Sequence, residues 1–195
     1  LHKYLPVLEN LQLIEREVPV TERAPHRSKR SLYGLQDPFV AFWFHCVYPF
    51  ASDLELGETR PALRRVRELL PHLLGRAYER IAREMIRRGE ALPFPLLRIG
   101  RWWDGQDEID VVGINEEANA ILFGEVKWSR KPLGIDILRD LKQKAVRVEW
   151  GRKGRREVFA LFSRGGFTPE LRRQAREEGV LLYERDQVVV STDAP

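Results

Sequence analysis

Three successive segments have the hydrophobic pattern of β-strands: residues 96–103 alternate loosely between apolar and polar, and residues 107–114 and 120–128 are largely apolar. Asp104-Gly105 separates the first two segments and is a strong hairpin-turn dipeptide. Residues 115–119 form a polar turn between the last two segments. The pattern therefore predicts a three-stranded antiparallel meander in the middle of the chain.

The segment after this meander alternates between helical and strand patterns. Apolar residues at helical spacing begin at Ile135 and leave a basic outer face, and an apolar strand covers residues 157–163. Thr168-Pro169 begins another helix, Gly179 ends it, and a strand follows at residues 180–183. Strand, helix and strand in this order predict a parallel pair with a right-handed crossover. The expected fold class is α/β, with a mixed β-sheet flanked by helices.

The first 36 residues have a different pattern. Leucines at helical spacing predict a helix over residues 1–12, and strands are predicted at residues 13–20 and 31–35. This order is typical of the back half of a winged helix, so we expect a partial winged-helix segment at the N-terminus. The polar loop between the strands would be the wing, and its candidate phosphate-binding residues are Arg27, Lys29 and Arg30. The alternative is an ordinary solvated hairpin in a protein-docking module.

An aromatic segment follows. Asp37-Pro38 is a helix-start signal, and residues 39–50 are dense in aromatic side chains. Because this run is apolar nearly all round, we expect it to pack between domains rather than to stack on bases. Residues 51–60 are predicted to be a linker.

A long amphipathic helix is predicted over residues 61–88, with a break near Pro71 or Gly75 left open. We expect its buried stripe to be Leu70, Leu74, Tyr78, Ile81 and Met85. Three parts of the chain result: a partial winged helix (1–36), an aromatic connector (37–60) and an α/β domain (61–195).

Composition excludes several classes of protein. Hydrophobic residues make up 43% of the 195 residues and charged residues 32%, which is typical of a chain with a packed core. No apolar run approaches the roughly 20 residues of a membrane span, and acidic residues interrupt the early apolar residues, so we expect neither a membrane partner nor a leader. The single cysteine, Cys46, excludes a disulfide framework and is expected to be a buried apolar filler. We therefore predict a reducing, cytoplasmic location. Because the chain starts at Leu1 within a helical pattern, we expect a fragment.

Charge is distributed unevenly around the meander. Residues 104–125 contain seven acidic residues and no Lys or Arg, whereas residues 127–156 carry a local net charge of +8. A metal-dependent enzyme that acts on polyanions needs such neighbours, since acids bind the cation and bases bind phosphates. The alternative is two surfaces that are solvated differently.

The candidate chemistry lies in the second and third strands of the meander. If the turn is residues 115–120, Ile114 pairs with Ile121 and Asp110 then lies opposite Glu125. Lys127 shares the face of Glu125 because alternate residues of a strand point the same way. Two carboxylates so close repel each other, and a cation such as Mg²⁺ or Mn²⁺ between them would remove that cost. A slip of one residue would put the acids on opposite faces, leaving a surface Glu–Lys pair and an isolated Asp.

An Asp on one strand and Glu-x-Lys on the next, with a helix before and helix–strand after, resemble the PD-(D/E)xK nuclease superfamily and hence a restriction-endonuclease-like fold. A closer resemblance is to the nuclease-like C-terminal domain of archaeal-type ATPases. It is carried by "YLPVLENLQLIEREVPV", "YGLQDPFVAFWFHCVYP", "GRAYERIAREMI", "EIDVVG", "FGEVKW" and "LFSRGGFTPEL".

This resemblance implies a metal site at Asp110 and Glu125 with Lys127 as the catalytic lysine. It also favours Glu79 as the catalytic acid of the preceding helix, whereas helical geometry alone does not choose between Glu79 and Glu84. The family's ATPase domain would precede Leu1. The chain has no P-loop motif, so we do not expect this fragment to bind ATP.

Three hypotheses follow. The first is a DNA-binding, Mg²⁺-dependent endonuclease domain, with further candidate phosphate contacts at Arg80, Lys142, Lys144 and Arg147. The second is a catalytically silent module that binds nucleic acid or protein and serves an ATPase. The third is an oligomerisation adaptor that docks through the aromatic run, with a second copy of the chain as one candidate partner.

Overall fold

The computed structural model describes residues 3–89 and 91–190. Its chain forms two compact units, which we describe separately. Unit 1 consists of Leu1–Glu17 and Arg30–Ala77, and unit 2 consists of Val18–Lys29 and Tyr78–Pro195. The sequence predicted three independently folding parts with boundaries at residues 36 and 60. That division stays a prediction.

Unit 1 begins with a short helix and a two-stranded antiparallel sheet. The helix α1 spans Leu5–Asn10, which is shorter than the predicted helix over residues 1–12, and residues 1–2 lie outside the described residues. Strand β1 (Ile14–Glu17) pairs with β2 (Leu32–Leu35), with Ile14 opposite Leu35. Helix, strand, loop and strand are thus in the predicted order, and the winged-helix assignment stays a prediction.

Helices make up the rest of unit 1, namely α2 (Pro38–Phe42), the π-helical turn η2 (Trp43–Val47), the 3-10 turn η3 (Tyr48–Phe50), α3 (Ala51–Glu55) and the first part of α4 (Arg60–Arg87). The predicted start signal is confirmed, because Asp37 Oδ1 accepts a hydrogen bond from the Phe39 N–H at 2.7 Å. Cys46 is fully buried as predicted, and burial raises the pKa of its thiol. The predicted linker over residues 51–60 is wrong in part, since it contains α3.

Helix α4 runs without interruption through Pro71. Its part in unit 2 buries Tyr78, Ala82 and Ile86, which lie four residues apart on one face. The predicted stripe is wrong at three positions, because Ile81, Leu70 and Leu74 are 50%, 38% and 37% exposed. The prediction took the large apolar residues of the helix as its buried face. The buried face instead carries the small Ala82, which lets the helix lie close to the sheet.

The core of unit 2 is a six-stranded mixed sheet in the order β3-β4-β5-β6-β7-β8. Strands β3 to β5 form the predicted antiparallel meander, β5 to β7 are parallel, and β8 returns antiparallel to β7. Their bounds are β3 (Arg98–Trp103), β4 (Glu108–Asn115), β5 (Ala120–Lys127), β6 (Arg156–Ser163), β7 (Leu181–Glu184) and β8 (Gln187–Val190). This confirms the predicted α/β class with a mixed sheet flanked by helices; β8 was not predicted.

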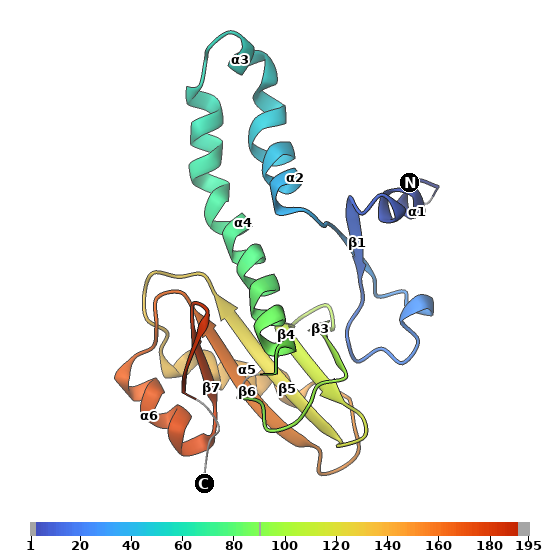
Figure 1. Cartoon of the computed structure of the whole chain (residues 1–195), viewed down its shortest axis with the longest axis vertical. Coiled ribbons are helices and arrows are strands. Elements are labelled where there is room, and N and C mark those ends of the chain that lie inside the picture. The colour runs from blue at the N-terminus through green and yellow to red at the C-terminus, as the bar shows by residue number, and fades with distance from the viewer. Residues whose placement is uncertain (1–2, 90, 191–195) are drawn as a thin grey trace. The chain divides into compact units, whose positions relative to one another are not determined.

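Two helices connect the parallel strands of this sheet (Figure 1). Helix α5 (Ile135–Val146) follows β5, and α6 (Pro169–Glu178) follows β6. Their buried residues Leu138, Leu141 and Leu171 join one core with the sheet, and the end of α4 covers a second core. The predicted ends of α6 are confirmed, since Thr168 Oγ1 accepts from the Leu171 N–H and Gly179 is left-handed at φ 67°.

Part of the loop predicted to be a wing belongs to unit 2. The Val20 N–H donates to the Arg101 carbonyl at 2.9 Å, and the Arg98 guanidinium donates to the Glu22 carbonyl at 3.0 Å. Val20 also joins the core beneath α5 and α6. The segment Val18–Lys29 therefore belongs to unit 2 and is bonded to β3 at Val20 and Glu22.

Candidate active site

The β4–β5 hairpin has the predicted register. Ile114 lies opposite Ile121, and the ladder continues to Val111 opposite Gly124. Asn115 fixes the turn, because its side-chain oxygen accepts from the Ala118 N–H at 2.9 Å.

The ladder ends one residue before Asp110, where side-chain bonding replaces backbone pairing. Asp110 Oδ2 accepts a hydrogen bond from the Val126 N–H at 2.9 Å, so its carboxylate is fixed beside β5 next to Glu125. Asp110 and Glu125 are only 6% and 4% exposed. Two acidic side chains are thus buried together at the carboxyl end of β5.

This neighbourhood changes the protonation of Asp110. Burial, followed by the nearby charges of Glu125 and Glu79, raises the pKa of Asp110 from 3.8 to about 7. The Val126 N–H and Lys127 act in the opposite direction but do not offset these causes. Asp110 is therefore only partly ionised near neutral pH.

Two ammonium groups flank Glu125. Lys127 Nζ lies 2.6 Å from Glu125 Oε1, and Lys144 Nζ, which reaches in from α5, lies 3.4 Å from Glu125 Oε2. Lys144 also pairs with Asp140 at 2.9 Å. Burial opposes the charged form of both lysines, yet the neighbouring carboxylates outweigh it and raise the pKa of each. Both lysines are therefore cations at neutral pH, and the Lys127 side chain is 41% exposed.

The end of α4 contacts the same place. Arg83 donates to the Asp110 carbonyl at 3.1 Å, and the hydroxyl of Tyr78 donates to the Arg185 carbonyl at 3.0 Å. Glu79 contributes to the raised pKa of Asp110, whereas Glu84 forms an exposed ion pair with Arg87. Of the two helix acids that the sequence left open, Glu79 is the one whose charge acts on Asp110.

Ser163 is a site residue that the sequence pattern did not indicate. It lies directly opposite Lys127 in the parallel ladder of β5 and β6 and is fully buried. Within the described part of the chain, its Oγ has no hydrogen-bond partner. The only signal in the sequence is a hydroxyl residue that ends an otherwise apolar strand at the same level as the lysine.

The donor set suits a hard cation. Among the described residues, no group of three or more His, Cys, Asp and Glu side chains could hold a metal ion. Asp110 and Glu125 offer carboxylate oxygens, and Mg²⁺ is typically bound by one or two carboxylates together with water and substrate phosphates. A divalent cation would also offset the burial and the carboxylate repulsion that together raise the pKa of Asp110. The residues present therefore fit Mg²⁺ or Mn²⁺ that is completed by a phosphate ligand.

The profile of family DUF234, described as "Archaea bacterial proteins of unknown function", matches residues 43–147. The chain belongs to this family. The matched DUF234 region includes Glu79, Asp110, Glu125, Lys127 and Lys144.

One similar protein is the uncharacterized protein MJECL04 of Methanocaldococcus jannaschii. It is 35% identical over 128 residues, which are 64% of this chain but 28% of that protein. The DUF234 chain described here therefore aligns with well under two thirds of that relative's length. No solved structure matches the chain.

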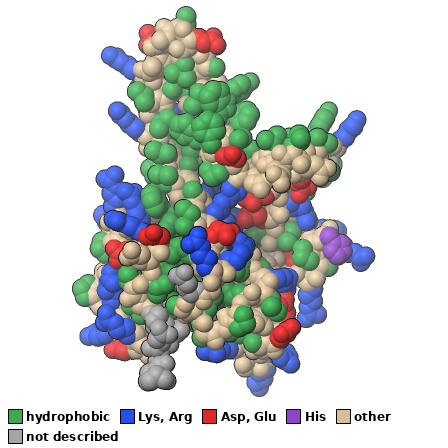
Figure 2. Space-filling view, viewed as in Figure 1, with side chains coloured by type: hydrophobic (Ala, Val, Ile, Leu, Met, Phe, Trp, Pro, Cys, Tyr) green, Lys and Arg blue, Asp and Glu red, His purple; other side chains and the backbone are tan. Residues whose placement is uncertain are grey.

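The predicted phosphate contacts of this DUF234 chain lie in varied surroundings. Lys142 pairs with Glu178 and Arg147 pairs with Asp107, whereas Lys144 points to Glu125 rather than outward. Arg27 ends the 3-10 turn η1 (Pro25–Arg27), Lys29 follows it, and Arg30 and Arg80 lie in unit 1 and in α4. On the visible face, basic side chains are interspersed with acidic ones (Figure 2). Their role in nucleic-acid binding stays a prediction.

No described helix is both long enough and apolar enough to cross a membrane.

Proposed function

We propose that unit 2 is a nuclease-like domain of the PD-(D/E)xK type, which hydrolyses phosphodiester bonds in DNA. The observation that carries this proposal is the buried pair of Asp110 and Glu125, with Lys127 bound to Glu125. Burying two carboxylates together is costly, and a cation-dependent reaction supplies a reason to keep them. The mixed sheet, preceded by α4 and followed by α5 and β6, supports a restriction-endonuclease-like fold.

The roles of the side chains follow from their positions. Asp110 and Glu125 would hold the Mg²⁺ or Mn²⁺, and Glu79 would add negative charge beside them. When bound, the cation supplies Lewis-acid activation of the phosphate and of water. Lys127, a partly exposed cation, would stabilise the negative charge that develops on the phosphate oxygens.

The reaction is a hydrolysis. Water oxygen forms a bond to phosphorus, and the bond between phosphorus and the leaving sugar oxygen breaks. One water proton leaves to solvent, and the leaving oxygen takes up a proton. Lys127 and Lys144 stay protonated throughout, because neighbouring carboxylates raise the pKa of both.

The intact protein is proposed to contain more than this domain. The relative MJECL04 extends well beyond the aligned region, and the resemblance to archaeal-type ATPases supports an ATPase domain elsewhere in the intact protein. ATP would then be bound by that domain and not by this chain, which has no P-loop motif.

Cleavage assays test this proposal. Supercoiled plasmid and single-stranded DNA are incubated with the chain in Mg²⁺, in Mn²⁺ and in EDTA. We expect nicking that needs the metal and that falls about 100-fold or more in Glu125→Gln and Lys127→Ala. Glu108→Gln is the matched control, because Glu108 is an exposed acid of the same hairpin that pairs with Arg101. Equal nicking by the control and by Glu125→Gln would exclude the carboxylate pair as the catalytic site.

A second candidate is a module that binds nucleic acid without cleaving it. Glu125 is already neutralised by Lys127 and Lys144, and the described residues provide no third metal-ligating side chain in a group. This candidate predicts salt-sensitive binding, no cleavage with either metal, and unchanged binding in Glu125→Gln.

A further inference from the structure

A separate pocket lies in unit 2 at the other end of β5. Its volume is about 1040 Å³, and its lining includes Arg23, Asn119, Trp150, Arg152 and Lys153. Asn119 directly precedes β5, whereas Glu125 is near its carboxyl end. Glu125 lies five positions after Ala120, and at about 3.3 Å per position this separates the two sites by roughly 17 Å.

The loop that forms one wall of this pocket is fixed by Arg155. Its guanidinium donates to the carbonyls of Val148 at 2.5 Å, Trp150 at 2.8 Å and Ala145 at 3.1 Å. It also pairs with Glu157 at 2.8 Å. Arg155 is therefore a structural residue, and three of its hydrogen bonds hold the backbone of the loop.

Asn119 ties the same loop to the β4–β5 turn. Its Oδ1 accepts from the Arg152 N–H at 2.8 Å, and its carbonyl accepts from the Arg156 N–H at 2.9 Å. The backbone around Trp150 and Arg152 is thus bonded on two sides without any ligand. Such a preformed wall lowers the entropic cost of binding.

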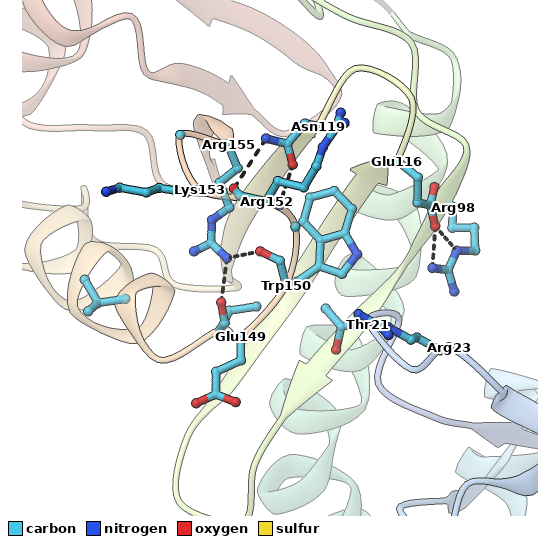
Figure 3. A pocket seen from close by; sticks show the side chains of 14 residues that line it. Thr21, Arg23, Arg98, Glu116, Asn119, Glu149, Trp150, Arg152, Lys153 and Arg155 are labelled. Atoms are coloured by element: carbon cyan, nitrogen blue, oxygen red, sulfur yellow. Dashed lines mark hydrogen bonds and ion pairs between the residues drawn. The ribbon is translucent and has the colours of Figure 1, made fainter.

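Three basic side chains line the pocket and are available to a ligand. In the part of the chain that the structure describes, the side chains of Arg23, Arg152 and Lys153 form no ion pair. Arg98, also in the lining, is bound to Glu116. Figure 3 shows the Trp150 indole near the centre of the pocket, with Arg152 and Lys153 on one side and Thr21 and Arg23 on the other.

Trp150 has one side against protein and one toward the pocket. The residue packs against the core formed with α5 and α6 and is only partly buried. An indole fixed in this way offers a flat surface for a planar aromatic group, and guanidinium and ammonium groups around it suit a phosphate. A purely acidic ligand would use the cations but not the indole.

We propose that this pocket binds a nucleotide, with the base stacked on Trp150 and the phosphate held by Arg152, Lys153 and Arg23. The nucleotide is the unpaired end of a strand or a free mononucleotide, which share this chemistry. This inference rests on the proposed function only in that a bound strand would continue toward Asp110 and Glu125. The roughly 17 Å between the pocket and Glu125 would be spanned by a few nucleotides.

Binding in EDTA tests the pocket independently of cleavage. Fluorescence anisotropy of a labelled 15-residue oligothymidylate is measured with the 195-residue chain. We expect Trp150→Ala to weaken binding about 5- to 100-fold and Trp150→Phe to keep most of the affinity. Arg152→Ser with Lys153→Ser should reduce the slope of log affinity against log salt by about 1.4, since each phosphate contact contributes about 0.7.

Two controls separate this site from general basic attraction and from the candidate active site. Arg173→Ser removes one exposed charge on α6, and we expect it to leave affinity within about twofold. Glu125→Gln should still bind the strand in EDTA even if it no longer cleaves DNA. Circular dichroism and thermal melting confirm that Trp150→Ala is folded.

Competition with unlabelled AMP identifies the source of the nucleotide. If AMP displaces the strand from wild type but not from Trp150→Ala, a free mononucleotide is sufficient. If only oligonucleotides compete, the ligand is the unpaired end of a strand. Affinity and salt slope that stay as in wild type in both Trp150→Ala and Arg152→Ser/Lys153→Ser would overturn the proposal.

Discussion

The two ends of strand β5 present charge in opposite ways. At the carboxyl end, Asp110 and Glu125 are buried, and burial together with the nearby charge of Glu125 raises the pKa of Asp110 to about 7. At the amino end, Arg152 and Lys153 line an open pocket whose backbone is held by Arg155. Buried acids carry an energetic cost that a bound cation would relieve, whereas exposed bases are solvated and cost little.

The two sites also depend on different structural features. The carboxyl end depends on strand register, because a slip of one residue would put the acids on opposite faces. The amino end depends on a loop whose hydrogen bonds join residues far apart in sequence, such as Asn119 and Arg152. The four predictions below change one end at a time.

Gly165→Ala should have the largest effect on stability. A Cβ at Gly165 would lie 2.6 Å from the carbonyl carbon and oxygen of Arg130 and 2.8 Å from the Ser129 carbonyl oxygen. Because these are backbone atoms of the loop after β5, they cannot yield without moving the loop. We expect the free energy of unfolding, measured in urea, to fall by about 3 kcal/mol.

Gly34→Ala is the control for this substitution, since nothing lies within 4 Å of a Cβ there. If Gly165→Ala and Gly34→Ala unfold at the same urea concentration, the close approach of the two loops beside the candidate active site is wrong.

Asp110→Asn should stabilise the metal-free chain at high pH. The folded-state pKa is raised from 3.8 to about 7, so the native state binds a proton that the unfolded chain has released between these values. This contribution is fully present below about pH 4 and is lost as pH rises through 7. In EDTA at pH 8, we expect the Asn variant to be more stable than wild type by about 2 kcal/mol.

At pH 4 that difference should nearly vanish, which thermal melts across the pH range can measure. Glu108→Gln, an exposed acid of the same hairpin, should follow the pH profile of wild type. If the wild-type chain is at least as stable as Asp110→Asn at pH 8, then ionising Asp110 beside Glu125 does not destabilise the fold, and the prediction is wrong.

The strongest sequence patterns are local. The Thr168 cap, the left-handed Gly179 and the register that pairs Ile114 with Ile121 were all predictable, since each depends on residues within one turn or hairpin. Asp110 beside Glu125 follows from that register. These predictions need no knowledge of distant parts of the chain.

Contacts between distant segments could not be predicted in this way. Lys144 has the position of an outward base on α5, yet α5 lies so that its ammonium reaches Glu125. Ser163 meets Lys127 only because β5 and β6 pair in parallel across a helix. The face of α4 was misjudged because Ala82, rather than Ile81, contacts the sheet.

Gly154→Ala should cost less than Gly165→Ala. Gly154 has φ 77°, and a Cβ there would meet nothing within 4 Å, so only backbone strain opposes alanine. We expect the free energy of unfolding to fall by about 1 kcal/mol. Oligothymidylate affinity should change less than about twofold, because Arg155 and Asn119 still hold the loop. A loss of 3 kcal/mol or of binding would mean that the amino end is packed as tightly as the carboxyl end.

Glu116→Gln should have the smallest effect on stability and a measurable one on binding. Glu116 forms an exposed pair with Arg98 at the pocket, and such pairs contribute about 0.5 kcal/mol. Burial opposes its charged form, but the hydrogen bond from Arg98 outweighs this and lowers the pKa of Glu116. The pair therefore stabilises the fold above the unfolded pKa of 4.5 and loses that contribution as pH falls.

Removing this carboxylate leaves Arg98 available to a phosphate, so oligothymidylate affinity at low salt should rise about two- to threefold. The gain should disappear in about 0.5 M salt, where charges more than a few ångströms apart are screened. Glu170→Gln, an acid in the first turn of α6, is the control for a general change in net charge. An equal gain in both variants would show that overall charge, and not the amino end of β5, governs the binding.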